Sequence, residues 1–181
     1  MKVIKFGGSS LSSSKNILKV LNIIKQYDDK TVIVLSAFGK TTNNIIDSGE
    51  LASKKNKGYK DLFKKIESYH FDIIRDLVDI NFQVKILTHV QKKFLDLENI
   101  LDGIYGVGEL SKSILDKISS YGELLSSYIF YEITKFNNLD TEYLDSRKII
   151  FTKKSTGNNI IIDFAKTQKN LELAIEKINA S

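Results

Sequence analysis

Apolar residues along the first forty positions alternate between strand-like and helix-like spacing. Lys2–Phe6 is a short strand candidate that runs into a glycine turn. Apolar residues then recur at helical spacing between 17 and 27, after serines at 12–14 that suit a helix N-cap. The β-branched run Thr31–Leu35 is typical of a strand buried on both faces of a parallel sheet. These elements predict a right-handed βαβ unit.

The rest of the chain is predicted to be mainly helical. Residues 42–101 carry two apolar stripes joined by a turn at 79–83, the pattern of an antiparallel helical hairpin. Glycines at 103, 106 and 108 break this pattern, and a further helix over 111–136 is interrupted near Gly122. Short strands at 141–144 and 159–163 and a helix over 165–178 follow. This order predicts a three-layer α/β fold with a mostly parallel sheet and a helical insertion.

Composition excludes several classes of function. The 181 residues are 42% hydrophobic and 27% charged, which suits one soluble globular domain, and they include no cysteine for disulfides or thiolate metal sites. His70 and His89 lie among the helical stripes without paired carboxylates, so we expect structural roles and no metal site. No apolar run approaches the ~20 residues of a membrane span, so we expect a cytoplasmic protein without a membrane partner.

The positive charge does not indicate nucleic-acid binding. The net charge is +5, but arginine occurs only at Arg75 and Arg147. Because nucleic-acid surfaces rely on arginine for bidentate contacts, we expect no nucleic-acid partner. The lysine-rich segment 54–65 is diluted by acidic residues and is interpreted as a solvated helix face. A non-catalytic module that binds an anionic partner stays open as an alternative, which retention on heparin at high salt would indicate.

The strongest candidate for chemistry lies at the carboxyl end of the first strand, where open α/β sheets bind their ligands. There, Gly7 and Gly8 expose backbone N–H groups that favour anions, and Lys5 adds a compact positive charge suited to phosphoryl oxygens. The lysine precedes the glycines, so this segment is not a Walker A loop. The alternative is a surface lysine followed by an ordinary glycine turn.

Two further segments carry polar residues that are candidates for a binding site. After the second strand, Ser36 and Thr42 offer hydroxyls around the flexible Gly39. Because neighbouring parallel strands end at one edge of a sheet, we expect this loop beside the first segment. Alternatively, the loop is an ordinary connection in which Thr42 caps the next helix. Glu123 follows a glycine at a helix start, a position that by itself indicates no more than dipole complementation.

Taken together, the three segments resemble the signatures of aspartokinases, which belong to the amino acid kinase fold. The opening Lys-Phe-Gly-Gly-Ser-Ser at 5–10 resembles their first motif, and Val-Leu-Ser-Ala at 34–37 with Thr42 and Asn43 resembles their second. Gly122, Glu123 and Ser126 match their Gly-Glu-x-x-Ser helix start. The likeness covers residues 1 to about 145. Segment 45–118 resembles the helical insertion of aspartokinases, including those fused to homoserine dehydrogenase.

The resemblance implies ATP-dependent phosphorylation of L-aspartate to 4-phospho-L-aspartate, with ATP and Mg²⁺ as cofactors, in a homo-dimer or higher homo-oligomer. It implies that Lys5 is the catalytic residue, which offsets charge on the transferring phosphoryl group. It also implies that Glu123 pairs with the α-ammonium group of aspartate. The implied phosphate-binding residues are Lys5, Gly7, Gly8 and Ser9, and the implied substrate-binding residues are Ser36, Ala37, Thr42, Glu123 and Ser126.

Later motifs of the resembled family do not occur in this sequence. They are an Arg-Gly-Gly-Ser-Asp segment and a Thr-Asp-Val-Asp-Gly stretch, which bind ATP and the substrate α-carboxylate. We therefore expect the amino-terminal portion of a longer enzyme, inactive by itself. In this interpretation, an incomplete kinase domain comprises the phosphate- and substrate-loop βαβ unit at 1–44, the helical insertion at 45–118, and the substrate-side helix with a β-β-α segment at 119–181. Kinases of another amino acid or small carboxylate in the same fold stay open as an alternative.

Overall fold

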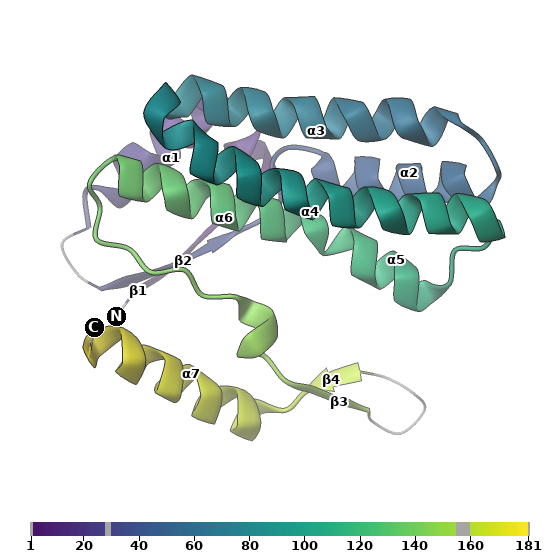
Figure 1. The fold of residues 1–181 in the computed structure, drawn as a ribbon. Coiled ribbons are helices and arrows are strands. Elements are labelled where there is room, and N and C mark those ends of the chain that lie inside the picture. Colours follow the sequence, from purple (N-terminus) through teal and green to yellow (C-terminus); the bar gives the residue numbers. More distant parts are fainter. Residues whose placement is uncertain (1, 28–29, 155–159, 181) are drawn as a thin grey trace. The chain divides into compact units, whose positions relative to one another are not determined.

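A computed structural model describes residues 2–27, 30–154 and 160–180 of the chain. It divides the chain into two units, of which the first ends at Thr141 and the second begins at Glu142. The first unit holds a pair of strands and a group of helices, seen in Figure 1. Its elements are β1 (Lys2–Phe6), η1 (Gly8–Leu11), α1 (Ser14–Ile24), β2 (Thr31–Leu35), α2 (Thr41–Ser53), α3 (Gly58–Leu77), α4 (Ile80–Val107), α5 (Lys112–Ser119) and α6 (Tyr121–Phe136).

The predicted βαβ unit is confirmed. β1 and β2 pair in parallel, with Phe6 opposite Leu35 at their carboxyl ends. α1 connects the strands, and its N-cap is Ser13, whose Oγ accepts a hydrogen bond from the backbone N–H of Asn16. Both strands therefore end at the same edge, which is where the sequence places its first two candidate segments.

The expectation that β2 is buried on both faces is wrong. Side chains alternate along each strand, so that Ile4, Phe6 and Ile33 pack toward the core of the first unit. On the opposite face of the sheet, Val3 is 66% exposed and Val34 is 43% exposed. The apolar run correctly indicates a strand of a parallel sheet, but only one face of that sheet contributes to the core of this unit.

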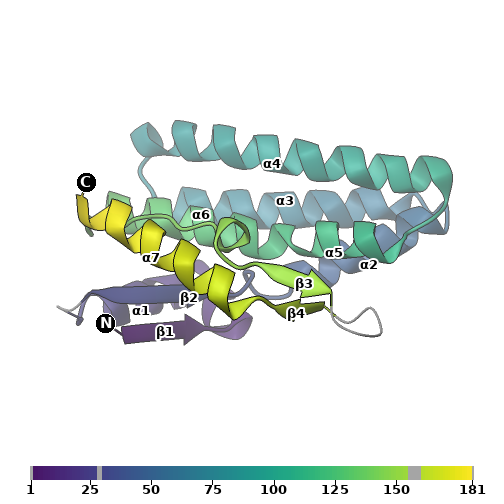
Figure 2. The same ribbon diagram turned by 90° about the horizontal axis from the view of Figure 1, so that it is seen from below.

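The helices build most of the first unit. α2 contacts α3, α4 and α5, while α3 packs on α4 and α4 packs on α6. Figures 1 and 2 show α3 and α4 running side by side, as the predicted helical hairpin requires. The shared core contains the fully buried residues Ile45, Ile74, Phe94, Leu97 and Leu101. None of the helices in the described part of the chain is long and apolar enough to cross a membrane.

The turn of the helical hairpin is shorter than predicted. α3 ends at Leu77 and α4 already begins at Ile80. Gln83, the last residue of the predicted turn, lies within α4. Its side-chain Nε2 donates to the carbonyl of Val78 at 2.8 Å, and its backbone N–H donates to the carbonyl of Asp79. These bonds close the turn over two residues and start the helix early.

Glycines at 103 and 106 do not break the second helix of the hairpin. α4 runs through both positions and ends at Val107, with Gly108 as its C-cap at φ +83°. A Cβ at either helical glycine would lie in open space, so both face away from the core. Packing of the apolar face outweighs their cost of about 1 kcal/mol each. The predicted interruption near Gly122 is confirmed, because α5 ends at Ser119 and α6 begins at Tyr121.

The second unit holds η2 (Ser146–Lys148), β3 (Thr152–Lys154), β4 (Ile160–Ile162) and α7 (Phe164–Ala180). The prediction of a strand at 141–144 is wrong, because these residues belong to no strand and lead toward η2. Asp145 caps η2 by accepting a hydrogen bond from the backbone N–H of Arg147, and its carboxylate pairs with the Arg147 guanidinium. The lysine-rich β3 carried no apolar alternation that could predict it, and it pairs antiparallel with β4. β4 lies within the strand predicted at 159–163, of which Asn159 is outside the described residues. α7 confirms the last predicted helix.

Candidate active site

The first candidate segment lies where β1 ends and the chain turns into the 3₁₀ helix η1. The side chains of Lys5 and Ser9 are exposed there. Gly7 has φ −79° and ψ 167°, which any residue can adopt, and a Cβ on it would meet no atom within 4 Å. Neither backbone strain nor packing therefore requires glycine at this position. The bare backbone instead leaves room for a ligand to approach the turn.

The second segment is bonded to the first beyond the ends of the strands. The backbone N–H of Ser36 donates to the carbonyl of Phe6, and that of Gly39 donates to the carbonyl of Gly8, each at 3.1 Å. A Cβ on Gly8 would lie 2.7 Å from the Gly39 oxygen and 3.0 Å from the Ala37 oxygen, so this approach requires glycine. Gly39 itself has φ +54°, in the left-handed region that favours glycine. Backbone hydrogen bonds and close glycine packing therefore fix the turn after β1 against the loop after β2.

α2 begins directly after this loop, with Lys40 at its N-cap. Thr41 is buried, and its Oγ1 donates to the carbonyl of Phe38 at 2.7 Å, which fixes the first turn of the helix. The alternative interpretation of Thr42 as the helix cap is wrong, because the cap position lies two residues earlier. The Thr42 Oγ1 instead donates to Oε1 of Glu123 at 3.5 Å. Thr42 thus faces the third segment.

The third segment, at the N-terminus of α6, packs directly on the second. A Cβ on Gly122 would lie 2.5 Å from Oγ1 of Thr42, so glycine allows the helix to approach this closely. Ser126 is fully buried, and its Oγ donates to the carbonyl of Ser36 at 2.9 Å. The carboxylate of Glu123 remains exposed in the first turn of the helix.

The structure therefore brings the three segments to one edge of the sheet. The first segment contributes an exposed lysine and an open glycine backbone, which suit an anion. The second and third segments contribute hydroxyls and an exposed carboxylate, which suit a group with an ammonium charge. An arrangement with both features can hold a phosphate and an amino acid next to each other.

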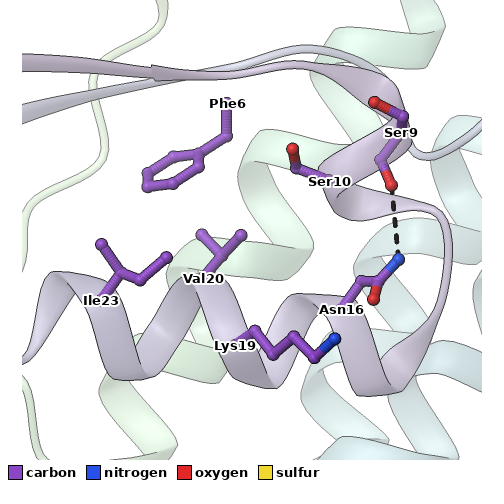
Figure 3. A pocket seen from close by; sticks show the side chains of 7 residues that line it. All are labelled: Phe6, Ser9, Ser10, Asn16, Lys19, Val20 and Ile23. Carbon is purple, nitrogen blue, oxygen red and sulfur yellow. Dashed lines mark hydrogen bonds between the residues drawn. The ribbon is translucent and has the colours of Figure 1, made fainter.

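An open pocket of about 320 Å³ lies between β1 and α1, beside the first segment (Figure 3). The Asn16 side chain donates to the carbonyl of Ser9 at 3.4 Å, which fastens η1 to the start of α1. Of the predicted site residues, the pocket includes Ser9 and does not extend to the loop after β2. Its lining residues are Phe6, Ser9, Ser10, Asn16, Lys19, Val20 and Ile23.

Three residues that were not among the predicted site residues support the site. Phe38 is fully buried in the second segment, and its ring stacks on His70 of α3 with the ring centroids 5.7 Å apart. The hydroxyl of Tyr69 lies 3.1 Å from the point that a Cβ on Gly39 would occupy. Helical spacing predicts that this face of α3 is buried, but it carries no signal for the loop that the face contacts.

The two histidines occupy different surroundings. His70 is fully buried, its Nδ1 lies 2.7 Å from the carbonyl of Ile66, and burial lowers its pKa from 6.5 to about 4. His89 stacks on Tyr128 with ring centroids 3.9 Å apart, and partial burial and the charge of Lys93 lower its pKa. Among the residues that the structure describes, no three His, Asp or Glu side chains are grouped so that they could hold a metal ion.

A parallel βαβ unit with a glycine turn, a polar loop after β2 and a glycine-led helix start at one edge defines an α/β protein with a candidate ligand site at the strand ends. The model of the amino acid kinase family matches residues 1–178, and the chain belongs to this family. This membership confirms the fold class that the three motifs predict.

Curated relatives of the chain are aspartokinases. Bifunctional aspartokinase/homoserine dehydrogenase 2, chloroplastic, of Arabidopsis thaliana is 26% identical over 169 residues, which cover 93% of this chain and 18% of the relative. Aspartokinase 1, chloroplastic, of the same plant is 37% identical over 132 residues, which cover 71% of this chain and 22% of the relative. The chain thus spans about a fifth of the length of these relatives.

Solved structures show the same fold. E. coli aspartokinase III in complex with aspartate and ADP matches with a TM-score of 0.86 at 22% identity, over 100% of this chain and 39% of that one. Clostridium acetobutylicum aspartate kinase matches with a TM-score of 0.69 at 25% identity, over 95% of this chain and 36% of that one.

Proposed function

We propose that the chain carries the substrate side of an aspartate kinase, which transfers the γ-phosphoryl group of ATP to the side-chain carboxylate of L-aspartate. The observation that carries the proposal is the meeting of the glycine turn after Lys5, the loop after β2 and the exposed Glu123 at one edge. The names of the curated relatives support aspartate as the acceptor. The chain spans about a fifth of the length of these relatives, so its aspartate kinase activity is itself part of the proposal.

In the proposed reaction, an oxygen of the aspartate side-chain carboxylate attacks the γ-phosphorus of ATP. A new O–P bond forms while the bond from that phosphorus to the β,γ-bridging oxygen breaks, and ADP leaves with the electron pair. We assign Lys5 to the oxygens of the transferring group, where its ammonium charge offsets the negative charge. Gly7, Gly8 and Ser9 are assigned to the phosphates, supported by the open space at the Cβ position of Gly7.

Recognition of aspartate is assigned to the second and third segments. The hydrogen bond that Glu123 accepts from Thr42 is long, at 3.5 Å, so its carboxylate retains capacity for the α-ammonium group. Such a charge-assisted contact distinguishes an amino acid from a plain dicarboxylate. Ser36, Ala37 and Thr42 are assigned to the rest of the substrate. Ser126, for which the resemblance implied substrate binding, is fully buried, so we assign it instead to holding the Ser36 carbonyl in place.

The proposal has further parts. Mg²⁺ would accompany ATP, and we assign no described residue to it, since none of them form a metal-binding group. We also propose that residues 45–118 form a helical insertion. In addition, we propose that the protein is a homo-oligomer and that it is located in the cytoplasm. Light scattering and cell fractionation test the last two parts.

Isothermal titration calorimetry of the protein with L-aspartate tests the proposal. We expect saturable binding of L-aspartate and no binding of succinate, which has both carboxylates but lacks the ammonium group. Glu123→Gln should abolish L-aspartate binding, while the matched change Glu109→Gln, in the exposed connection between α4 and α5, should leave it intact. A wild-type protein that prefers L-glutamate, or that binds succinate equally well, would contradict the assignment.

A further inference from the structure

We propose that Tyr69 and His70 of α3 are positioning residues that hold the loop after β2 in the geometry that binds aspartate. This loop, residues 36–40, is called the substrate loop below. The inference rests on the proposed function and extends its machinery into the helical segment 45–118. The His70 ring stacks on Phe38 of the substrate loop, and the Tyr69 hydroxyl lies beside Gly39, although both residues follow the loop by some thirty residues in the sequence.

His70 presents a fixed ring face to the substrate loop. The carbonyl of Ile66 can only accept, so Nδ1 carries the proton and donates to it at 2.7 Å, which sets the plane of the ring. That plane stacks on the fully buried Phe38 at an interplanar angle of 30°. The other ring nitrogen, Nε2, is buried without a hydrogen-bond partner among the described residues. A phenyl ring would avoid that cost, so stability alone does not explain a histidine here.

Phe38 transmits this orientation to the start of α2. Its carbonyl accepts two hydrogen bonds from Thr41, one from the backbone N–H at 3.1 Å and one from Oγ1 at 2.7 Å. These bonds fix the first turn of α2 and hence the direction of Thr42, the residue that faces Glu123. A change in the ring plane of His70 therefore changes the placement of a substrate-side hydroxyl.

Tyr69 supports the other half of the substrate loop. Its half-buried ring places the hydroxyl 3.1 Å from the Cβ position of Gly39. The N–H of Gly39 donates to the carbonyl of Gly8 in the glycine turn at 3.1 Å. The Tyr69 hydroxyl thus limits the movement of the residue that joins the substrate loop to the phosphate side.

α3 can support the substrate loop because α3 itself is fixed by contacts with α1 and α4. Near its carboxyl end, Asp76 accepts a hydrogen bond of 2.7 Å from Oγ of Ser14 at the start of α1. On its other side, Phe94 of α4 meets the His70 ring edge-on, with the ring centroids 5.4 Å apart. A shift of α3 or α4 would therefore displace the His70 ring and, with it, the substrate loop.

His70→Phe and Tyr69→Phe test the inference by separating affinity from stability. His70→Phe keeps an aromatic ring but removes both the orienting donor and the unpartnered Nε2. We expect an unchanged or higher melting temperature together with roughly tenfold weaker L-aspartate binding, because small misplacements of binding groups are costly. Tyr69→Phe removes only a hydroxyl and should weaken binding about threefold. A purely structural role would move affinity and stability together. The control His89→Phe should retain wild-type affinity.

Wild-type affinity in both variants would overturn the inference. A wild-type protein that does not bind L-aspartate would instead refute the proposed function, and the positioning role would then be decided in the ligand-free protein. Faster amide hydrogen exchange at Gly39 and Thr41 in His70→Phe would support the positioning role, and unchanged exchange would overturn it. If His70→Phe does not fold, Tyr69→Phe decides the outcome by the same two measurements.

Discussion

Acidification should destabilise the protein through His70, by an amount that follows from its burial. The pKa of this imidazole is lowered from 6.5 to about 4 by burial, which the hydrogen bond to Ile66 opposes only in part. The unfolded chain therefore binds a proton near pH 6.5, whereas the folded protein binds it only near pH 4. Between these values the unfolded state holds more protons. The free energy of unfolding is hence unaffected above pH 6.5 and falls as the pH drops toward 4.

The size of this loss can be measured by urea unfolding at pH 7 and pH 4.5. At about 1.4 kcal/mol per pKa unit, His70 should cost the wild-type protein roughly 2 to 3 kcal/mol over this interval. Carboxylates also gain protons, but they do so equally in His70→Phe, so the difference between the two proteins isolates the histidine. His89→Gln serves as the control and should retain most of the wild-type loss. An equal loss of unfolding free energy in wild type and His70→Phe would refute the conclusion that the His70 imidazole is buried and neutral.

Four glycine and serine substitutions test the packing of the site. Gly8→Ala should destabilise the protein by about 1 to 3 kcal/mol in urea unfolding, because its Cβ would meet two backbone oxygens at 2.7 and 3.0 Å. Gly7→Ala should stay within about 0.5 kcal/mol of wild type but weaken ATP binding, as measured by calorimetry with the same two proteins. Gly122→Ala should lower both the melting temperature and L-aspartate affinity, because its Cβ would press the helix away from the substrate loop. Ser126→Ala should cost about 1 to 3 kcal/mol of unfolding free energy, because the Ser36 carbonyl loses a buried donor. Equal stability of Gly7→Ala and Gly8→Ala would contradict the described turn.

The site could be predicted from the sequence to the extent that strand ends determine it. The apolar spacing of β1, α1 and β2 predicts a parallel pair, and a parallel pair places Gly8 and Gly39 at one edge. Local motifs also singled out Gly122 and Glu123. That α6 approaches the substrate loop depends on long-range packing, which only the resemblance to aspartokinases implied.

Other features could not be predicted because neighbouring structure decides them. Gly106 is helical despite its low propensity, since the long apolar face of α4 holds the helix in place. The strand β3 lacks an apolar pattern and exists through its pairing with β4. The periodicity of α3 predicts that His70 is buried, but its contact with Phe38 depends on how α3 packs against the substrate loop.

We propose above that L-aspartate binds between the substrate loop and the start of α6. NMR titration of the nitrogen-15-labelled protein with L-aspartate tests it most directly, since each backbone amide reports on its own position. Saturable shifts are expected at residues 36–42 and 122–126, and these shifts should be absent in Glu123→Gln and with succinate. Shifts concentrated in the pocket between β1 and α1, or shifts that Glu123→Gln leaves unchanged, would contradict it.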